Sequence, residues 1–150
     1  MDDKRTVSGR VHGGAFRRIL VGFDGSREAQ EALRAAVALA DELRGEVRVL
    51  LVVRPPSHVE TPGELAAAAA AERDSLSRGL SELRHATGRG VDRRVVHADD
   101  PARALADHAE EHGFDLLVVG CHGRDHATHR GIGGSVEALL RRHPCPVLVV

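Results

Sequence analysis

The sequence predicts a single α/β domain in which a parallel β-sheet is covered by helices on both faces. Five short apolar runs alternate with four segments that read as helices, most clearly from apolar residues recurring at helical spacing. Helical connections between consecutive strands make those strands parallel and bury the sheet on both sides. A length of 150 residues fits one domain, and 42% hydrophobic with 29% charged residues is an ordinary globular composition.

The first strand and helix follow from a change in the period of the apolar residues. Residues 19–23 form a continuous apolar run, which is typical of a strand covered on both faces. Ser26 is a good N-cap for the helix that follows, and we expect this helix to close at Gly45. Residues 47–53 form a second apolar strand, stopped by Pro55. The apolar face of the helix consists of Ala29, Leu33, Ala36, Val37, Ala40 and Leu43.

Residues 64–87 are predicted to form the second helix, since they include six consecutive alanines, and alanine has the highest helix propensity. The helix is expected to end at Gly88 and Gly90. Residues 91–97 then alternate in polarity, which indicates a weaker strand. The leucines that continue the apolar face of this helix are Leu76, Leu80 and Leu83.

A third helix is predicted to begin at Asp100, because Asp is a favoured N-cap and Pro101 suits the first helical position. The pair Asp99 and Asp100 could also bind a metal ion, but we favour the capping role. Gly113 is expected to end the helix. The core-facing residues of this helix are Ala102, Leu105, Ala106 and Ala109.

The last part of the chain contains the clearest buried strand, Leu-Leu-Val-Val at residues 116–119. A polar loop over residues 120–134 leads to a short helix over residues 135–142. A final apolar strand over residues 146–150 completes the alternation of strands and helices.

Composition excludes several classes of function. A net charge of −1 and 2% aromatic residues give no basis for holding nucleic acid or an anionic membrane by charge or stacking. Lys4 is the only lysine, so the phosphate-binding lysine of a P-loop or a protein kinase is missing, as is the lysine of a receiver domain. No G-x-S-x-G motif is present for a serine hydrolase. Cys121 and Cys145 lack C-x-x-C spacing, which fits a reducing compartment.

Residues 1–16 are predicted to be a flexible leader, because they are polar and rich in glycine. They lack the apolar segment of a signal peptide, and no stretch of the chain approaches about 18 apolar residues. We therefore expect a cytoplasmic protein whose single domain covers residues 17–150.

Two strand ends carry residues suited to an anionic ligand. Ligands of such sheets bind beyond the carboxyl ends of the strands. The first strand ends in Asp24, and the fourth ends in Gly120, whose loop closes with residues 133–135 at a helix N-terminus. Glycines let backbone N–H groups approach a phosphate, and Arg124 and Arg130 could add positive charge. The alternative is a flexible loop whose glycines only end a strand and start a helix.

The segments 19–26, 115–123, 134–136 and 145–150 together resemble the universal stress proteins, over about residues 17–150. The resemblance implies a doubly wound, Rossmann-like sheet with the strand order 3-2-1-4-5. The ATP-binding branch of the family carries the pattern G-x2-G-x9-G-[ST]. By resemblance, Asp24 and Val53 would line the adenosine, and Val119 and Gly120 would lie under the ribose. Gly123, Gly134 and Ser135 would hold the phosphates, with Val136 at the start of the helix.

The loop departs from the family pattern by one residue. Ten residues, 124–133, separate Gly123 from the pair Gly134 and Ser135, where the pattern has nine. Counting nine places Gly133 in the glycine position and Gly134 where Ser or Thr belongs. One extra loop residue has a small entropic cost, but the count leaves the phosphate contacts open between these two alignments.

The cysteines and histidines have simpler interpretations than a metal site. Cys121, His122, His126 and His129 share the loop and could bind zinc, although solvated or phosphate-adjacent histidines are favoured. Cys145 lies between two prolines and is expected to be a small buried apolar residue rather than a redox group.

The resemblance implies an ATP-binding universal stress protein that acts as a nucleotide-dependent switch or sensor in the stress response, with ATP bound with or without Mg²⁺. The motifs contain no positioned general base, so any ATP hydrolysis is expected to be slow. The main alternative is a family member that binds no nucleotide and acts as a dimeric interaction module. An enzyme acting on adenylate-like substrates is the third hypothesis, which the lack of a nucleophile–base pair disfavours.

A homodimer is predicted through residues 146–150. In the order 3-2-1-4-5 these residues form an edge strand, and we expect nothing downstream to cover it. Val147 and Val149 would face one side, and Leu148 and Val150 the other. An uncharged apolar edge favours pairing with a second copy about a two-fold axis. The alternative is a monomer whose edge is protected by the flanking prolines.

Overall fold

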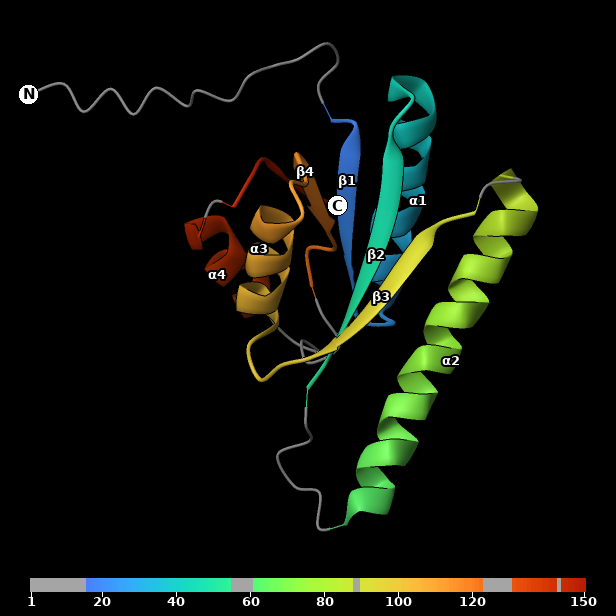
Figure 1. Ribbon diagram of the computed structural model, residues 1–150, viewed down its shortest axis with the longest axis vertical. Coiled ribbons are helices and arrows are strands. Elements are labelled where there is room, and N and C mark those ends of the chain that lie inside the picture. The colour runs from blue at the N-terminus through green and yellow to red at the C-terminus, as the bar shows by residue number, and fades with distance from the viewer. Residues whose placement is uncertain (1–15, 55–60, 88–89, 123–130, 143) are drawn as a thin grey trace, which may run out of the picture.

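The computed structural model describes residues 16–54, 61–87, 90–122, 131–142 and 144–150 (Figure 1). The strands form one parallel sheet in the order β3-β2-β1-β4-β5, so the predicted fold class and strand order are confirmed. In chain order the elements are β1 (Arg18–Phe23), α1 (Arg27–Leu43), β2 (Glu46–Val53), α2 (Pro62–Thr87), β3 (Asp92–His97), α3 (Pro101–Glu111), β4 (Leu116–Val119), α4 (Gly134–Arg142) and β5 (Val147–Val149).

Alternate side chains of the strands enter two separate cores, one on each face of the sheet. In β1, Ile19 and Val21 pack with α1 and α2, whereas Leu20 packs with α3 and α4. All four residues of β4 are buried, which agrees with the continuous apolar run in the sequence. This two-sided burial fixes the strands, and with them the positions of the loops that follow.

Two helices, α1 and α3, begin where the sequence predicts, because a side chain caps each of these starts. Ser26 Oγ accepts a hydrogen bond from the backbone N–H of Ala29 at 3.1 Å. Asp100 caps α3 in the same way, accepting from the N–H of Arg103 at 3.1 Å, so the capping role for this carboxylate is confirmed.

Gly45 closes α1 by donating its backbone N–H to the carbonyl of Ala40 at 2.8 Å, but it is not the left-handed residue of this turn. The left-handed residue at the end of α1 is Arg44, with φ of 55°. Gly45 is buried instead, and a Cβ atom there would lie 3.0 Å from the backbone oxygens of Phe16 and Arg17. Glycine is therefore required at this position by the close approach of the chain entering β1.

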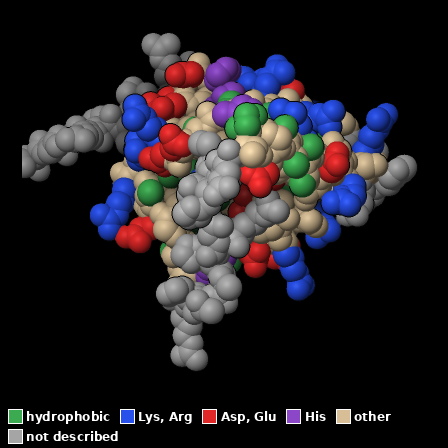
Figure 2. Space-filling model, turned by 90° about the horizontal axis from the view of Figure 1, so that it is seen from below, with side chains coloured by type: hydrophobic (Ala, Val, Ile, Leu, Met, Phe, Trp, Pro, Cys, Tyr) green, Lys and Arg blue, Asp and Glu red, His purple; other side chains and the backbone are tan. Residues whose placement is uncertain are grey.

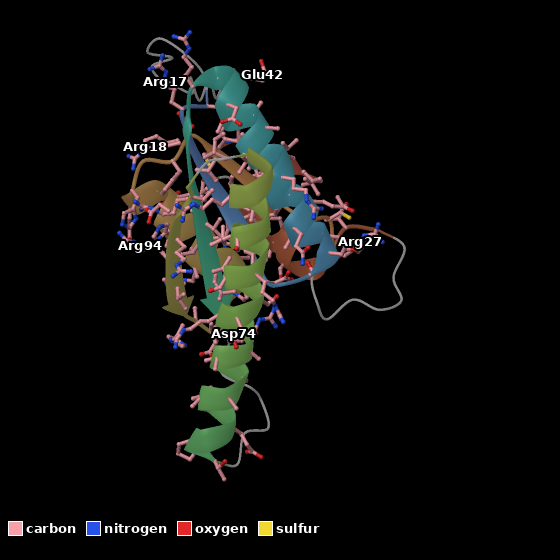
Figure 3. The ribbon with its side chains drawn as sticks, turned by 90° about the vertical axis from the view of Figure 1, so that its right-hand side faces the viewer. Arg17, Arg18, Arg27, Glu42, Asp74 and Arg94 are labelled. Carbon is pink, nitrogen blue, oxygen red and sulfur yellow. The ribbon has the colours of Figure 1, made fainter. Side chains whose placement is uncertain are left out.

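The helix α2 starts two residues earlier than the alanine run suggests and extends past the sheet. Thr61 and Glu64 form a capping box, each side chain accepting from the backbone N–H of the other. The first turns of α2 project beyond the carboxyl ends of the strands (Figures 1 and 3). Ala69 and Leu76 are buried in the core, but most of the alanine run is exposed.

In the described part of the chain, no helix is both long and apolar enough to cross a membrane.

Candidate functional site

The carboxyl ends of β1, β2 and β4 meet at one edge of the sheet, which is the edge that Figure 2 looks onto. The strand order reverses between β1 and β4, and ligands of open α/β sheets bind beyond the strands at such a point. α4 begins at the same edge, because the N–H of Gly133 donates to the carbonyl of Cys121 just after β4, at 2.9 Å. We name this region the carboxyl-edge site and define it by Asp24, Val53, Arg54, Gly120, Gly134 and Ser135.

The turn after β1 holds Asp24 in place. One carboxylate oxygen of Asp24 accepts a hydrogen bond from the backbone N–H of Ser26 at 2.9 Å, and Asp24 is half-buried. Gly25 between them has φ of 80°, a conformation that favours glycine. A Cβ atom on Gly25 would also lie 3.1 Å from Ser75 Oγ, so α2 packs closely over the turn. The carboxylate is thus held in place beside the start of α1.

Gly120 lies at the end of β4, and its packing against α1 requires a glycine there. A Cβ atom on Gly120 would lie 2.7 Å from the backbone carbon of Glu28 and 3.0 Å from the nitrogen of Ala29. The first turn of α1 therefore occupies the space that any other side chain would need. This explains the glycine independently of a ligand.

The start of α4 is the open part of the carboxyl-edge site. Outside its own helix and its two chain neighbours, no described residue has an atom within 4 Å of the position that a Cβ atom on Gly134 would take, and Ser135 is exposed. Helix N-termini carry backbone N–H groups without helical partners and a partial positive charge. The arrangement suits a phosphate group.

Arg54 extends from the end of β2 to this helix start. Its Nη2 atom donates to Ser135 Oγ at 3.5 Å, joining residues 81 positions apart in the sequence. Sequence analysis did not identify Arg54 as a site residue. A signal was present, since Arg54 is a cation placed directly after a buried strand at its carboxyl end.

The sequence-predicted site residues do not all present side chains to this edge. Asp24, Gly120, Gly134 and Ser135 lie at the edge as expected. Three valines have side chains buried in the two cores, so only their backbone atoms can face a ligand: Val53, Val119 and Val136, with 2%, 6% and 6% exposed. Gly123, Arg124, Arg130 and most of the extended loop lie outside the described residues.

The hypothesis of a zinc site also depends on residues that are not described, His126 and His129. Cys121 Sγ lies 3.1 Å from His122 Nδ1. Among the residues that the structure describes, no group of three or more His, Cys, Asp or Glu side chains could hold a metal ion. Burial, with the nearby charges of Asp115 and Glu110, raises the pKa of Cys145 to about 11, which fits the predicted unreactive thiol.

A cavity of about 220 Å³ lies at the opposite, amino edge of the sheet, away from the carboxyl-edge site. Arg18 and Arg48 lie over the ring of Phe114, at 5.1 and 5.3 Å from its centroid. Arg18 also pairs with Glu46 at 3.1 Å, and Arg48 with Asp92 at 2.7 Å. These charges neutralise one another around an apolar ring, so we interpret the cluster as structural.

Comparison with known proteins agrees with this arrangement. Residues 15–150 match the model of the universal stress protein family. The universal stress protein YxiE of Bacillus subtilis is 29% identical over 148 residues, which cover 90% of this chain and 99% of the relative.

Two solved structures extend the comparison to three dimensions. The universal stress protein UspA from Lactobacillus plantarum aligns with a TM-score of 0.78 at 25% identity, covering 91% of this chain and 98% of that chain. The universal stress protein from Archaeoglobus fulgidus in complex with dAMP shares the fold, with a TM-score of 0.66 at 23% identity, covering 89% and 97%. The family-model match, the strand order, and the glycines at the end of β4 and at the start of α4 all point to the same family. The chain belongs to the universal stress protein family.

Proposed function

We propose that this chain binds ATP at the carboxyl-edge site and acts as a nucleotide-dependent switch or sensor in the stress response. The observation that carries the proposal is the start of α4, where no described residue beyond the helix itself approaches the Cβ position of Gly134 and Ser135 is exposed. The fold accommodates an adenine nucleotide in the Archaeoglobus fulgidus relative in complex with dAMP. A crowded or buried helix start would have argued against phosphate binding.

Each site residue has a role that its chemistry allows. Asp24 and the backbone of Val53 would line the adenosine, and the backbone of Val119 with Gly120 would lie under the ribose. Gly123, Gly134, Ser135 and the N–H of Val136 would bind the phosphates. Mg²⁺, when present, would neutralise part of the phosphate charge.

ATP is expected to stabilise the protein. At about a hundredfold excess of ATP over its Kd, binding adds about 2.7 kcal/mol to the free energy of unfolding, because only the folded chain forms the site. For a domain of this size that raises Tm by about 5–10 °C. Thermal unfolding with millimolar ATP, with and without Mg²⁺, measures the shift. An unchanged Tm under both conditions would contradict the proposal and favour the dimeric interaction module that binds no nucleotide.

We also propose that two copies of the chain pair through β5. The strand lies at the edge of the sheet, where it is hydrogen-bonded to β4 on one side. Among the described residues, the exposed large apolar side chains are Ile132 and Leu148, 55% and 39% exposed. Val147 and Val149 pack toward the α3 and α4 core instead. Leu148 is therefore the side chain through which the edge can be tested.

Sedimentation at micromolar concentration should show a species of about twice 16.1 kDa. Leu148→Lys is expected to shift it to the monomer, since a charge on an edge strand opposes pairing. Val149→Lys is a poorer probe, because it would also disturb the core. A parent protein that sediments as a monomer, or a dimer that Leu148→Lys leaves intact, would rule out this interface.

A further inference from the structure

Arg54 occupies a position from which it can act on a bound ligand. Its backbone follows Val53 at the carboxyl end of β2, and its guanidinium reaches Ser135 in the first turn of α4. The contact therefore runs from one wall of the carboxyl-edge site to the other. The side chain is exposed, so it is accessible to a ligand at this edge.

Other arginines near this edge are arranged differently. Arg27 lies at the start of α1, 3.4 Å from Glu31 on the same helix, and Figure 3 shows it directed outward. Arg103 in the first turn of α3 lies 3.5 Å from Asp107, again on its own helix. These pairs are on the outer surfaces of their helices. Arg54 instead crosses the site toward the helix start that we propose for the phosphates.

The chemistry of the contact favours a phosphate over the hydroxyl that is bonded now. A guanidinium carries a fixed charge and can donate two parallel hydrogen bonds to a phosphate group. The Ser135 hydroxyl is neutral and accepts one bond, at the long distance of 3.5 Å. Because Lys4 is the only lysine of the chain, a cationic side chain that binds phosphates in the domain has to be an arginine or a histidine.

We infer that Arg54 is the residue through which this site selects nucleotides that carry a phosphate chain over adenosine. The inference rests on the proposed ATP binding and adds a specificity residue that the family motif does not include. Arg54 would leave Ser135 and donate to phosphate oxygens at the start of α4. The adenosine part of the ligand would lie against Asp24 and the backbone of Val53, which a change in the Arg54 side chain leaves in place.

The test is the affinity of parent, Arg54→Ala and Arg54→Lys proteins for ATP and for adenosine, measured by calorimetry. Arg54→Ala is expected to weaken ATP binding about tenfold or more, the effect of losing a charge-assisted hydrogen bond. Adenosine affinity should change by less than about twofold. Arg54→Lys should keep part of the ATP affinity, because the charge remains but the planar donor pair is lost. ATP binding by Arg54→Ala should also depend less on salt.

Arg93→Ala is the matched control. Arg93 Nη1 donates to Ser77 Oγ at 3.2 Å, so this variant also removes an arginine–serine hydrogen bond, but between β3 and α2. It should leave both affinities unchanged. A loss confined to ATP in Arg54→Ala, with Arg93→Ala unchanged, supports the inference.

Three other results would overturn it in distinguishable ways. If the parent binds ATP and Arg54→Ala binds it equally well, Arg54 does not contact the phosphates. If Arg54→Ala loses ATP and adenosine affinity in the same proportion, the residue shapes the site without selecting phosphate. If the parent binds neither ligand, the proposed function fails and the inference fails with it.

Discussion

Gly134→Asp is expected to abolish ATP binding while the protein stays folded and at least as stable as the parent. An added Cβ atom at Gly134 would lie more than 4 Å from every described residue outside its own helix and its two chain neighbours, so we expect the fold to tolerate the new side chain. A carboxylate in the first turn of α4 favours the helix by about 0.3–1 kcal/mol. The same carboxylate would occupy the place of the phosphates and repel them, and like charges in a binding site cost several kcal/mol. We expect at least about a hundredfold loss of ATP affinity, or about 2.7 kcal/mol.

Calorimetry with ATP and thermal unfolding without it measure the two effects separately. Gly134→Ala is the control for bulk, since it adds a side chain without charge, and it should weaken ATP binding much less. If Gly134→Asp binds ATP as the parent does, the phosphates are not at the start of α4. If Gly134→Asp unfolds at a Tm well below that of the parent, the expectation that the fold tolerates this side chain is wrong.

Gly120→Ala is expected to lower stability by about 3 kcal/mol, at the upper end of the range for overpacked cores. The added methyl group would lie 2.7 Å from the backbone of Glu28, and a backbone atom cannot move aside as the end of a long side chain can. Either α1 or the end of β4 has to shift. In the absence of nucleotide, Tm should fall by about 6–12 °C.

Gly63→Ala provides a control with the opposite sign. Among the described residues, apart from its two chain neighbours and the backbone of its own helix, the nearest atom to a Cβ atom there is Thr61 Oγ1, at 3.9 Å, and Gly63 lies in the first turn of α2. Replacing glycine by alanine in a helix should raise stability by about 0.4–1 kcal/mol. A Gly120→Ala protein that melts with the parent would mean that α1 does not press on the end of β4.

Much of the fold could be predicted because local patterns and tertiary packing agree. The run at residues 116–119 is buried at every position, and the side chains of Ser26 and Asp100 cap the helices that they precede in the sequence. The end of α1 was less predictable. Arg44 adopts the left-handed conformation, and the need for Gly45 comes from its close approach to Phe16 and Arg17, which immediately precede β1.

The site was predictable only where its residues belong to a motif. The glycines of the family pattern are visible in the sequence, but the packing of Gly120 against α1 depends on how the helix crosses the sheet. The role of Arg54 at the site depends on a contact with Ser135, 81 positions further along the chain, and no local sequence pattern predicts such a contact. Alternation in β5 correctly separates Val147 and Val149 from Leu148, yet it does not tell which set is covered by α3 and α4.

The projecting first half of α2 has a consequence for hydrogen exchange. Its alanine run, apart from Ala69, is exposed, so the backbone amides there are protected by the helix itself rather than by a core. Amides around Leu76, which is 2% exposed, are tied to the sheet and exchange only when the larger structure opens. We therefore expect the two parts of this continuous helix to open separately. Its first half can fray and re-form without unfolding the domain, while the part around Ser75 stays packed over the turn that holds Asp24.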